Sequence, residues 1–193
     1  MVQKIFLVRH GLTMWNNERR YQGHTDTKLS PEGIEQAVLL QKRMQHENLS
    51  AVYSSDLQRA YETARIIAQP HNLEVEVCPD LREINFGVWE GLTYNDIEIN
   101  YPDLLKLWLE TPHLLNIPKG ESFLLVKERA IKSIKGIIKS NHKEDVLIVT
   151  HGGTIAALIC AIKEKSLKEM WQYKQSNTSV TTLNVNKDRK SVV

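Results

Sequence analysis

A short apolar run near the start of the chain ends in an arginine, a histidine and a glycine. Residues 5–8 are all apolar, and Arg9, His10 and Gly11 follow them. An unbroken apolar run of this length is typical of a strand buried on both faces, and the glycine allows a sharp turn after it. We therefore expect Arg9 and His10 at the carboxyl end of a central strand, where open α/β sheets bind their ligands. A fixed-fork cation beside an imidazole nucleophile suits the chemistry of a phosphate ester.

A second stretch late in the chain repeats this pattern. Residues 146–149 are apolar, and Thr150, His151 and Gly152 follow them. If both runs are strands of one sheet, their carboxyl ends bring two imidazoles to one site. Matching contexts at both ends of the chain favour a shared function over two unrelated structural histidines.

Strand and helix signals alternate between these two stretches. We expect strands at residues 5–8, 51–54, 74–77, 146–150 and 178–185. Ser30 and Pro31 predict a helix start, and Ser55 with Gln58 fits a capping box that opens a second helix. The apolar face expected for the first helix consists of Ile34, Ala37, Val38, Leu40 and Met44. A long helix is expected after residues 120–122, and an apolar one at 155–162. This alternation predicts an α/β fold, a three-layer α/β/α sandwich with a mostly parallel central sheet.

The segment between about 93 and 122 interrupts the alternation. A helix is expected near Thr93, and prolines at 102, 112 and 118 break up the residues after it. We predict one domain over residues 1–193 with a small inserted lid at about 93–122. The lid's apolar residues are expected to pack as a helix core and not to face a ligand; they are Leu104, Leu105, Leu107, Trp108 and Leu109.

Composition excludes several classes of partner. A formal net charge of +2 gives no reason to propose nucleic acid. Cys78 and Cys160 lack the paired spacing of a zinc site, and Cys160 lies in an apolar stretch that predicts a buried thiol. The apolar run at the N-terminus stops at Arg9, unlike that of a secretory signal. No segment approaches the roughly 20 apolar residues of a membrane span. We expect a cytoplasmic protein.

The motifs together resemble the histidine phosphatase superfamily, also called the phosphoglycerate-mutase-like family. The match is carried by an ordered set of short motifs over most of the chain, and no single motif decides it. They are Leu7-Val8-Arg9-His10-Gly11, Trp15-Asn16, Gln22-Gly23, Leu29-Ser30-Pro31-Glu32-Gly33, residues 54–60, Thr63-Ala64, Leu81-Arg82-Glu83, residues 87–91 and Thr150-His151-Gly152. The resemblance implies the same three-layer fold and a phosphatase that forms a phosphohistidine.

The resemblance also implies roles for individual residues. Arg9 and Arg59 would bind the phosphoryl oxygens, which offsets the charge of the dianion. His10 would be the nucleophile, His151 a donor to the transferring phosphoryl oxygens, and Glu83 the proton donor to the leaving oxygen. Loop groups of Asn16, Gln22, Gly23 and Gly152 would complete the phosphate site, although turn-forming roles for Asn16, Gln22 and Gly23 stay open. No metal and no cofactor is expected.

A phosphoglycerate mutase is the nearest alternative. Mutases of this family follow the glutamate with a tyrosine and a lysine and carry a basic insertion for a substrate carboxylate. This chain has Phe86 and Tyr94 at the first two places, and its only basic residues between 102 and 118 are Lys106 and His113. The sequence therefore favours hydrolysis of phosphate monoesters of small metabolites.

Two further alternatives belong to other classes. A catalytically silent domain that binds phosphorylated ligands is disfavoured because all five catalytic positions are present. A metal-dependent phosphatase is disfavoured because no carboxylate–histidine cluster has the expected grouping. Among phosphatases, the chain looks most like the branch of the broad-specificity and α-ribazole phosphatases. The sequence does not choose between these two, and it leaves the substrate and the oligomeric state open.

Overall fold

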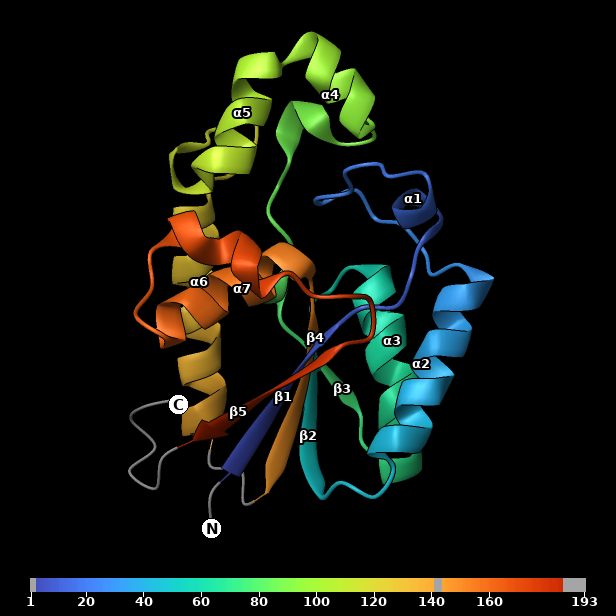
Figure 1. Cartoon of the computed structure of the whole chain (residues 1–193). Helices are drawn as coiled ribbons and strands as arrows, with labels where there is room; N and C mark the ends of the chain where they lie inside the picture. Colours follow the sequence, from blue (N-terminus) through green and yellow to red (C-terminus); the bar gives the residue numbers. More distant parts are fainter. Residues whose placement is uncertain (1–2, 141–143, 186–193) are drawn as a thin grey trace.

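The computed structural model describes residues 3–140 and 144–185, and its centre is a five-stranded sheet (Figure 1). The strands are β1 (Gln3–Arg9), β2 (Leu49–Ser54), β3 (Val75–Val77), β4 (Asp145–Thr150) and β5 (Val180–Val185), in the order β3-β2-β4-β1-β5. All neighbouring pairs are parallel except β1 and β5. The structure confirms the mostly parallel sheet and places the short strand β3 at an edge.

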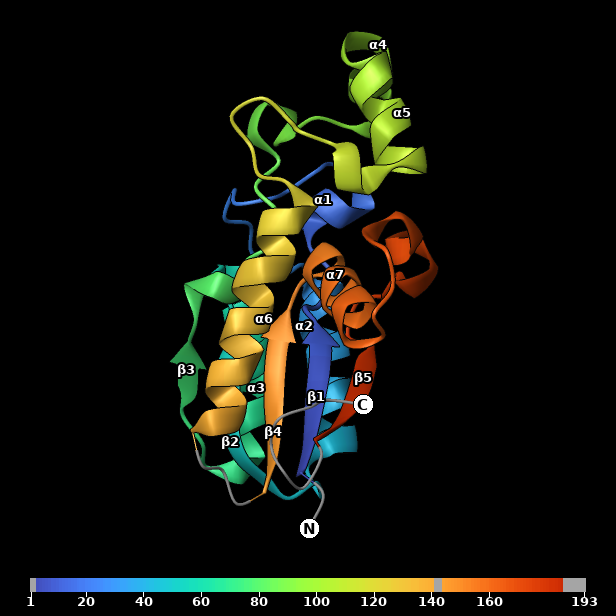
Figure 2. The same cartoon turned by 90° about the vertical axis from the view of Figure 1, so that its left-hand side faces the viewer.

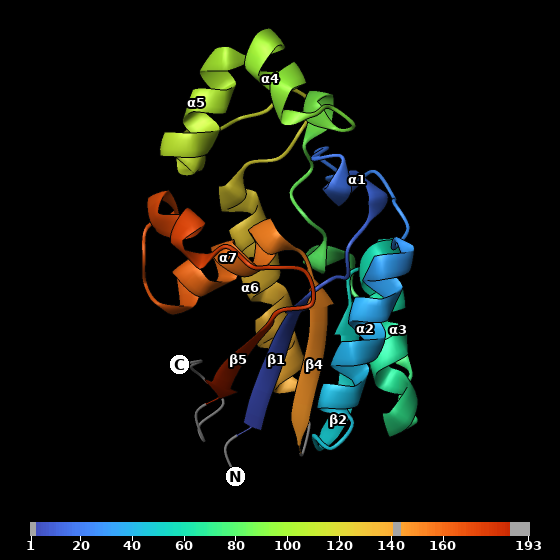
Figure 3. The same cartoon turned by 45° about the vertical axis from the view of Figure 1, so that its right-hand side comes forward.

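Helices cover both faces of the sheet, so the three-layer prediction is also confirmed (Figures 2 and 3). Helices α2 (Pro31–Met44) and α3 (Gln58–Ala68) cover one face, and α6 (Phe123–Lys139) and α7 (Gly152–Ile162) cover the other. Alternate side chains of β1 point to the two layers: Phe6 and Val8 pack against α2 and α3, whereas Ile5 and Leu7 pack against α6 and α7. Each such buried side chain contributes about 1.5–3 kcal/mol of burial free energy.

Two helices, α4 (Tyr94–Asn100) and α5 (Pro102–Glu110), lie beyond the carboxyl ends of the strands, at the top of Figure 1. They occupy the segment expected to form the lid. A separate apolar cluster, which includes Trp89, Leu105 and Phe123, joins this segment to α6 and α7. The remaining elements are the short helix α1 (Met14–Asn17) and the 3₁₀ turns η1 (Gln69–His71), η2 (Pro79–Leu81), η3 (Gly87–Trp89), η4 (Pro112–Leu114) and η5 (Leu167–Tyr173).

Helix starts agree with the sequence in most places but not at α3. The Ser30 hydroxyl caps α2 by accepting from the Gly33 N–H at 3.0 Å, as predicted. The capping box of Ser55 and Gln58 is wrong: α3 begins at Gln58, whose N–H donates to the Asp26 carboxylate at 2.7 Å. A tertiary contact from a distant loop therefore replaces the local cap.

The buried stripe of α2 includes Gly33 and leaves out two predicted residues, Ile34 and Val38, of which Val38 is only partly buried. It consists of Gly33, Ala37, Leu40 and Met44, and Ile34 is 45% exposed. A stripe with spacings of four, three and four residues begins at Gly33, and Ile34 lies about 100° around the helix from it.

The two cysteines differ in environment. Cys160 is fully buried, as predicted, whereas Cys78 is partly exposed and its Sγ lies 3.0 Å from the Ser133 hydroxyl. Within residues 3–140 and 144–185, histidine, cysteine and acidic side chains form no group of three that would hold a metal ion. None of the helices in these ranges is both long and apolar enough to cross a bilayer.

Candidate active site

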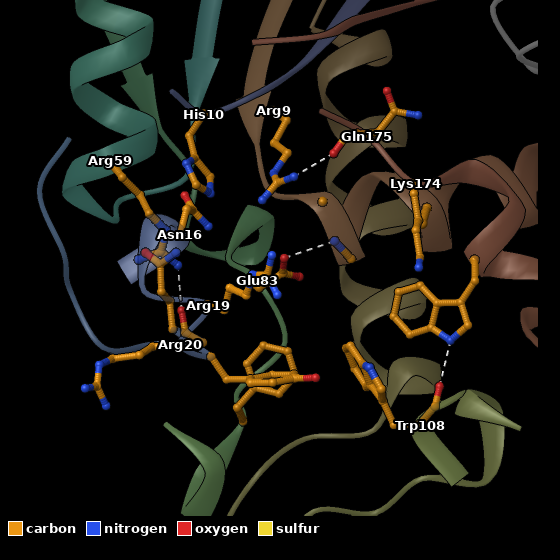
Figure 4. A pocket seen from close by; sticks show the side chains of 18 residues that line it. Arg9, His10, Asn16, Arg19, Arg20, Arg59, Glu83, Trp108, Lys174 and Gln175 are labelled. Carbon is orange, nitrogen blue, oxygen red and sulfur yellow. Dashed lines mark hydrogen bonds between the residues drawn. The ribbon is translucent and has the colours of Figure 1, made fainter. Parts of the chain in front are cut away.

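The carboxyl ends of β1 and β4 meet in the sheet, so the two His-Gly motifs are neighbours. Arg9 pairs with Thr150 in the strand register, and the His10 N–H donates to the Thr150 carbonyl at 3.0 Å. A pocket of about 360 Å³ opens at this edge (Figure 4). Eight of the nine predicted site residues line it: Arg9, His10, Asn16, Gln22, Gly23, Arg59, Glu83 and Gly152. The ninth, His151, lies beneath the surface and packs against His10, with ring centroids 5.1 Å apart.

His10 is held in one tautomer. Its Nδ1 lies 2.7 Å from the Gly11 carbonyl oxygen, which can only accept, so Nδ1 carries the proton and Nε2 keeps a free lone pair. Burial lowers the pKa of His10 well below its ordinary value, and the positive charges of Arg59 and Arg9 lower it further. The imidazole is therefore neutral at physiological pH and has the form that a nucleophile needs.

His151 is also neutral. Its side chain is fully buried, and neither ring nitrogen has a hydrogen-bond partner within the described residues. Burial is the main cause that lowers its pKa, followed by the charge of Arg59. A buried imidazole without a partner is costly in a folded protein, so a ring held here at the strand end favours a ligand role.

The two buried imidazoles predict a fold that loses stability in acid. Both pKa values lie below that of an unfolded histidine, about 6.5. The unfolded chain therefore binds more protons once the pH falls below that value, and each histidine costs about 1.4 kcal/mol per pH unit there. We expect the melting temperature to fall between pH 7.5 and 5.5. The melting temperature should fall less steeply with pH in the double variant His10→Gln/His151→Gln. An identical pH dependence in the variant and the wild type would mean that these two histidines do not cause the loss of stability in acid.

Arg9 and Arg59 are fixed by backbone carbonyls. Arg9 donates from Nη1 to the Gln175 carbonyl at 2.6 Å. Arg59, in the first turn of α3, donates to the carbonyls of Gly23 at 2.7 Å and Thr25 at 3.0 Å. Burial lowers the pKa of Arg59 to about 10, so its guanidinium stays charged at neutral pH. The Nε of each arginine is buried without a described partner. These donors suit the oxygens of a phosphoryl group.

The Glu83 carboxylate is bound by the first backbone N–H groups of α7, a helix that begins about 70 residues later in the chain. The carboxylate accepts from the N–H groups of Gly153 at 2.9 Å and Thr154 at 3.1 Å. The residue that precedes α7, His151, makes no side-chain cap, so Glu83 supplies the acceptor that the helix end lacks. Gly153 permits this approach, because a Cβ there would lie 2.6 Å from a Glu83 oxygen.

Two other carboxylates of this region, Asp56 and Glu121, are each paired with an arginine. Arg82 forms its ion pair with Asp56, so Glu83 is not the partner of its neighbour. Glu121 is paired with Arg129 at 2.8 Å and does not line the pocket. Among these carboxylates Glu83 is the one that faces the pocket.

The loop residues predicted to bind phosphate also have structural roles. Asn16 Oδ1 accepts from the Thr13 N–H at 3.1 Å, and the Thr13 hydroxyl accepts from the Asn16 N–H at 3.2 Å, which together cap α1. Gln22 Oε1 accepts from the Thr13 hydroxyl at 3.0 Å. Gly23 has a φ of +57°, and a Cβ there would lie 2.2 Å from Glu90. All three residues line the pocket as well, and their binding of phosphate stays a prediction.

Several other residues of the pocket were largely missed by the sequence interpretation. They are Arg19, Arg20, Tyr21, Phe86, Trp108, Trp171, Lys174 and Gln175. Trp108 was expected only to pack; it does pack on Trp171, with centroids 4.4 Å apart, but it also lines the pocket. The Arg19-Arg20 pair was visible as a basic dipeptide, whereas nothing in the segment after α7 pointed to the site.

Comparisons with known proteins agree with this fold and identify its family. The profile of the Histidine phosphatase superfamily (branch 1) matches residues 5–193. The chain is 34% identical to phosphoserine phosphatase 1 of Hydrogenobacter thermophilus, over 98% of this chain and 90% of that protein. The structure of YhfR from Bacillus stearothermophilus superposes with a TM-score of 0.93 at 35% identity, over 99% and 94% of the two chains. A mycobacterial glucosyl-3-phosphoglycerate phosphatase, solved with VO3, gives 0.90 at 32% identity, over 98% and 95%. This chain belongs to the histidine phosphatase superfamily.

Proposed function

We propose that this protein hydrolyses phosphate monoesters of small metabolites through a phosphohistidine at His10. The observation that carries the proposal is a neutral, buried His10 whose Nε2 is free, beside arginine and histidine nitrogens that have no described protein partner. The similarity to phosphatases over nearly the whole chain makes it a phosphoric monoester hydrolase.

The reaction has two steps. In the first, Nε2 of His10 attacks phosphorus, the bond from phosphorus to the ester oxygen breaks, and Glu83 gives a proton to the departing oxygen. Arg9 and Arg59 hold the phosphoryl oxygens and offset their charge. In the second step water attacks the phosphohistidine, Glu83 takes up the proton, and inorganic phosphate leaves. His151 donates to the phosphoryl oxygens from beside His10.

The pocket supports hydrolysis over mutase activity. The resemblance implies that a mutase of this family carries a basic insertion that binds a substrate carboxylate. Trp108 is the one residue between 93 and 122 among those that line the pocket, so this segment supplies no cation to it.

The rest of the molecule fits the same proposal. We propose one domain in which α4 and α5, at about 93–122, form a lid over the pocket. The apolar cluster that joins this segment to α6 and α7 supports a single domain. The enzyme would act in the cytoplasm on free small molecules, and not on nucleic acid or membranes.

Metal independence tests the proposal. Arginines supply the charge compensation, so the rate of p-nitrophenyl phosphate hydrolysis should be unchanged in EDTA. Loss of activity on chelation that a divalent ion restores would contradict the phosphohistidine mechanism, because it would assign the activation to a metal.

A further inference from the structure

The pocket carries an excess of positive charge beyond what a phosphate requires. Its lining contains five cationic side chains: Arg9, Arg19, Arg20, Arg59 and Lys174. Glu83 is the one carboxylate of the lining, and two N–H groups of α7 hold it. Arg9 and Arg59 are committed to the phosphoryl group. Three cations of the lining, Arg19, Arg20 and Lys174, therefore remain for other groups of the substrate.

Two of these three cations are uncompensated in the described part of the chain. Arg20 is not one of them, because it pairs with Glu18 and donates to the Gly91 carbonyl. Lys174 has its ammonium 5.8 Å from the centre of the Trp171 ring and no described acceptor. Arg19 likewise has no described side-chain partner. In Figure 4 the Lys174 side chain extends into the pocket toward Trp108.

We propose that Lys174 binds a second anionic group of the substrate, and that the preferred substrates carry an additional carboxylate or phosphate on the leaving group and no ammonium. This inference rests on the proposed function. An anion beside Lys174 gains from its ammonium, whereas an ammonium there meets a like charge, and the one carboxylate of the lining, Glu83, is already held by N–H groups of α7.

Three matched substrates test the inference, since each leaves as a primary alkoxide. They are 3-phosphoglycerate, phosphoserine and glycerol 3-phosphate: the second replaces a hydroxyl with an ammonium, and the third replaces the carboxylate with a hydroxymethyl group. We expect kcat/KM for 3-phosphoglycerate to exceed each of the other two by about five-fold or more, the size of an exposed ion-pair effect. Equal values, or a preference for phosphoserine, would overturn it.

Variants assign the preference to a residue. In Lys174→Met the ratio of kcat/KM for 3-phosphoglycerate to that for glycerol 3-phosphate should fall toward one. Lys168→Met is the matched control, because Lys168 is exposed on η5 and does not line the pocket. An unchanged ratio in Lys174→Met would overturn the role of Lys174. If p-nitrophenyl phosphate is hydrolysed through His10 but no ratio moves, this inference fails and the proposed function stands.

A different set of contacts identifies a positioning residue for Glu83. Arg129 of α6 donates to the carbonyls of Asp80 and Arg82, both at 2.7 Å, and of Glu83 at 2.9 Å. Two further bonds to Glu121, at 2.8 and 2.9 Å, fix the guanidinium. The Arg129 side chain therefore binds three backbone carbonyls of the turn that carries Glu83. Arg129 itself does not line the pocket.

We infer that Arg129 positions the proton donor of the reaction. Its five bonds use the planar fork of arginine, which lysine does not reproduce. Weakening them leaves His10 in place but shifts Glu83 relative to the leaving oxygen. The penalty should therefore depend on how much the leaving group needs a proton.

The test compares an alkyl with an aryl ester. In Arg129→Lys we expect kcat for glycerol 3-phosphate to fall by about ten-fold more than kcat for p-nitrophenyl phosphate. Glu121→Gln, which keeps the shape of the partner, should shift the ratio in the same direction. Arg65→Lys is the control, since Arg65 is an exposed arginine paired with Glu62. Equal losses for both esters in both variants would overturn the inference and leave Arg129 a structural residue.

Discussion

Replacing His10 with alanine is expected to lower kcat by at least about 10⁴-fold, on aryl and alkyl esters alike. Removal of a nucleophile leaves only the part of catalysis that binding and charge complementarity provide, and such losses are among the largest known for single substitutions. His10 is also the one ring of the pair that lines the pocket, with Nε2 free for attack. Steady-state rates on p-nitrophenyl phosphate and glycerol 3-phosphate check the expectation.

The control for this variant is His46→Ala. His46 is an exposed histidine at the end of α2, and its described contact is with Gln45. It should keep the wild-type rate. A His10→Ala protein that folds, as judged by its melting curve, and still turns over within ten-fold of the wild type would place the nucleophile elsewhere.

Replacing Glu83 with glutamine is expected to cost an alkyl phosphate about 10²–10⁴-fold in kcat/KM, and p-nitrophenyl phosphate much less. A basic alkoxide gains most from a proton as it departs, whereas a nitrophenolate is already stabilised. The ratio of the two losses is the measurement, because kcat/KM reports the transition state relative to free enzyme and substrate.

The structure adds a reason to rely on the ratio. Both carboxylate oxygens accept from N–H groups, one from Gly153 and the other from Ile84 and Thr154. A glutamine has to direct an NH₂ group at one of these donors, which displaces the side chain and lowers both rates. Equal losses for the two esters would mean that Glu83 positions the phosphate and does not donate a proton.

Local patterns in the sequence were sufficient to predict the two strands that end at His10 and His151. The apolar runs before His10 and His151 predict two buried strands, and their pairing in the sheet follows from the parallel architecture. Arg59 lies at the positive end of α3, where a cation does not stabilise the helix, and this position favours a ligand role. The resemblance to a family then assigned chemistry to these positions.

Contacts between distant segments were not predictable in this way. Nothing local to Glu83 indicates that it caps α7, and the cap of α3 by Asp26 replaced the one that Ser55 and Gln58 suggested. Likewise, Trp171 and Lys174 reach the pocket because η5 packs on α7 and on the helix α5 that carries Trp108. Such contacts depend on how distant segments pack together, and the apolar periodicity of a single segment gives no information about that packing.

The most direct test of the phosphohistidine account is to trap the intermediate. Wild-type enzyme is mixed with ³²P-labelled substrate, quenched in alkali within milliseconds, digested and mapped by mass spectrometry. The account predicts a phosphate on the peptide that contains His10, stable in alkali and lost in acid, and absent from His10→Ala. A phosphate on another residue would contradict the account. So would turnover with no phosphoenzyme at any quench time, if the transfer to ¹⁸O-labelled water also inverts the configuration at phosphorus, as a single direct step does.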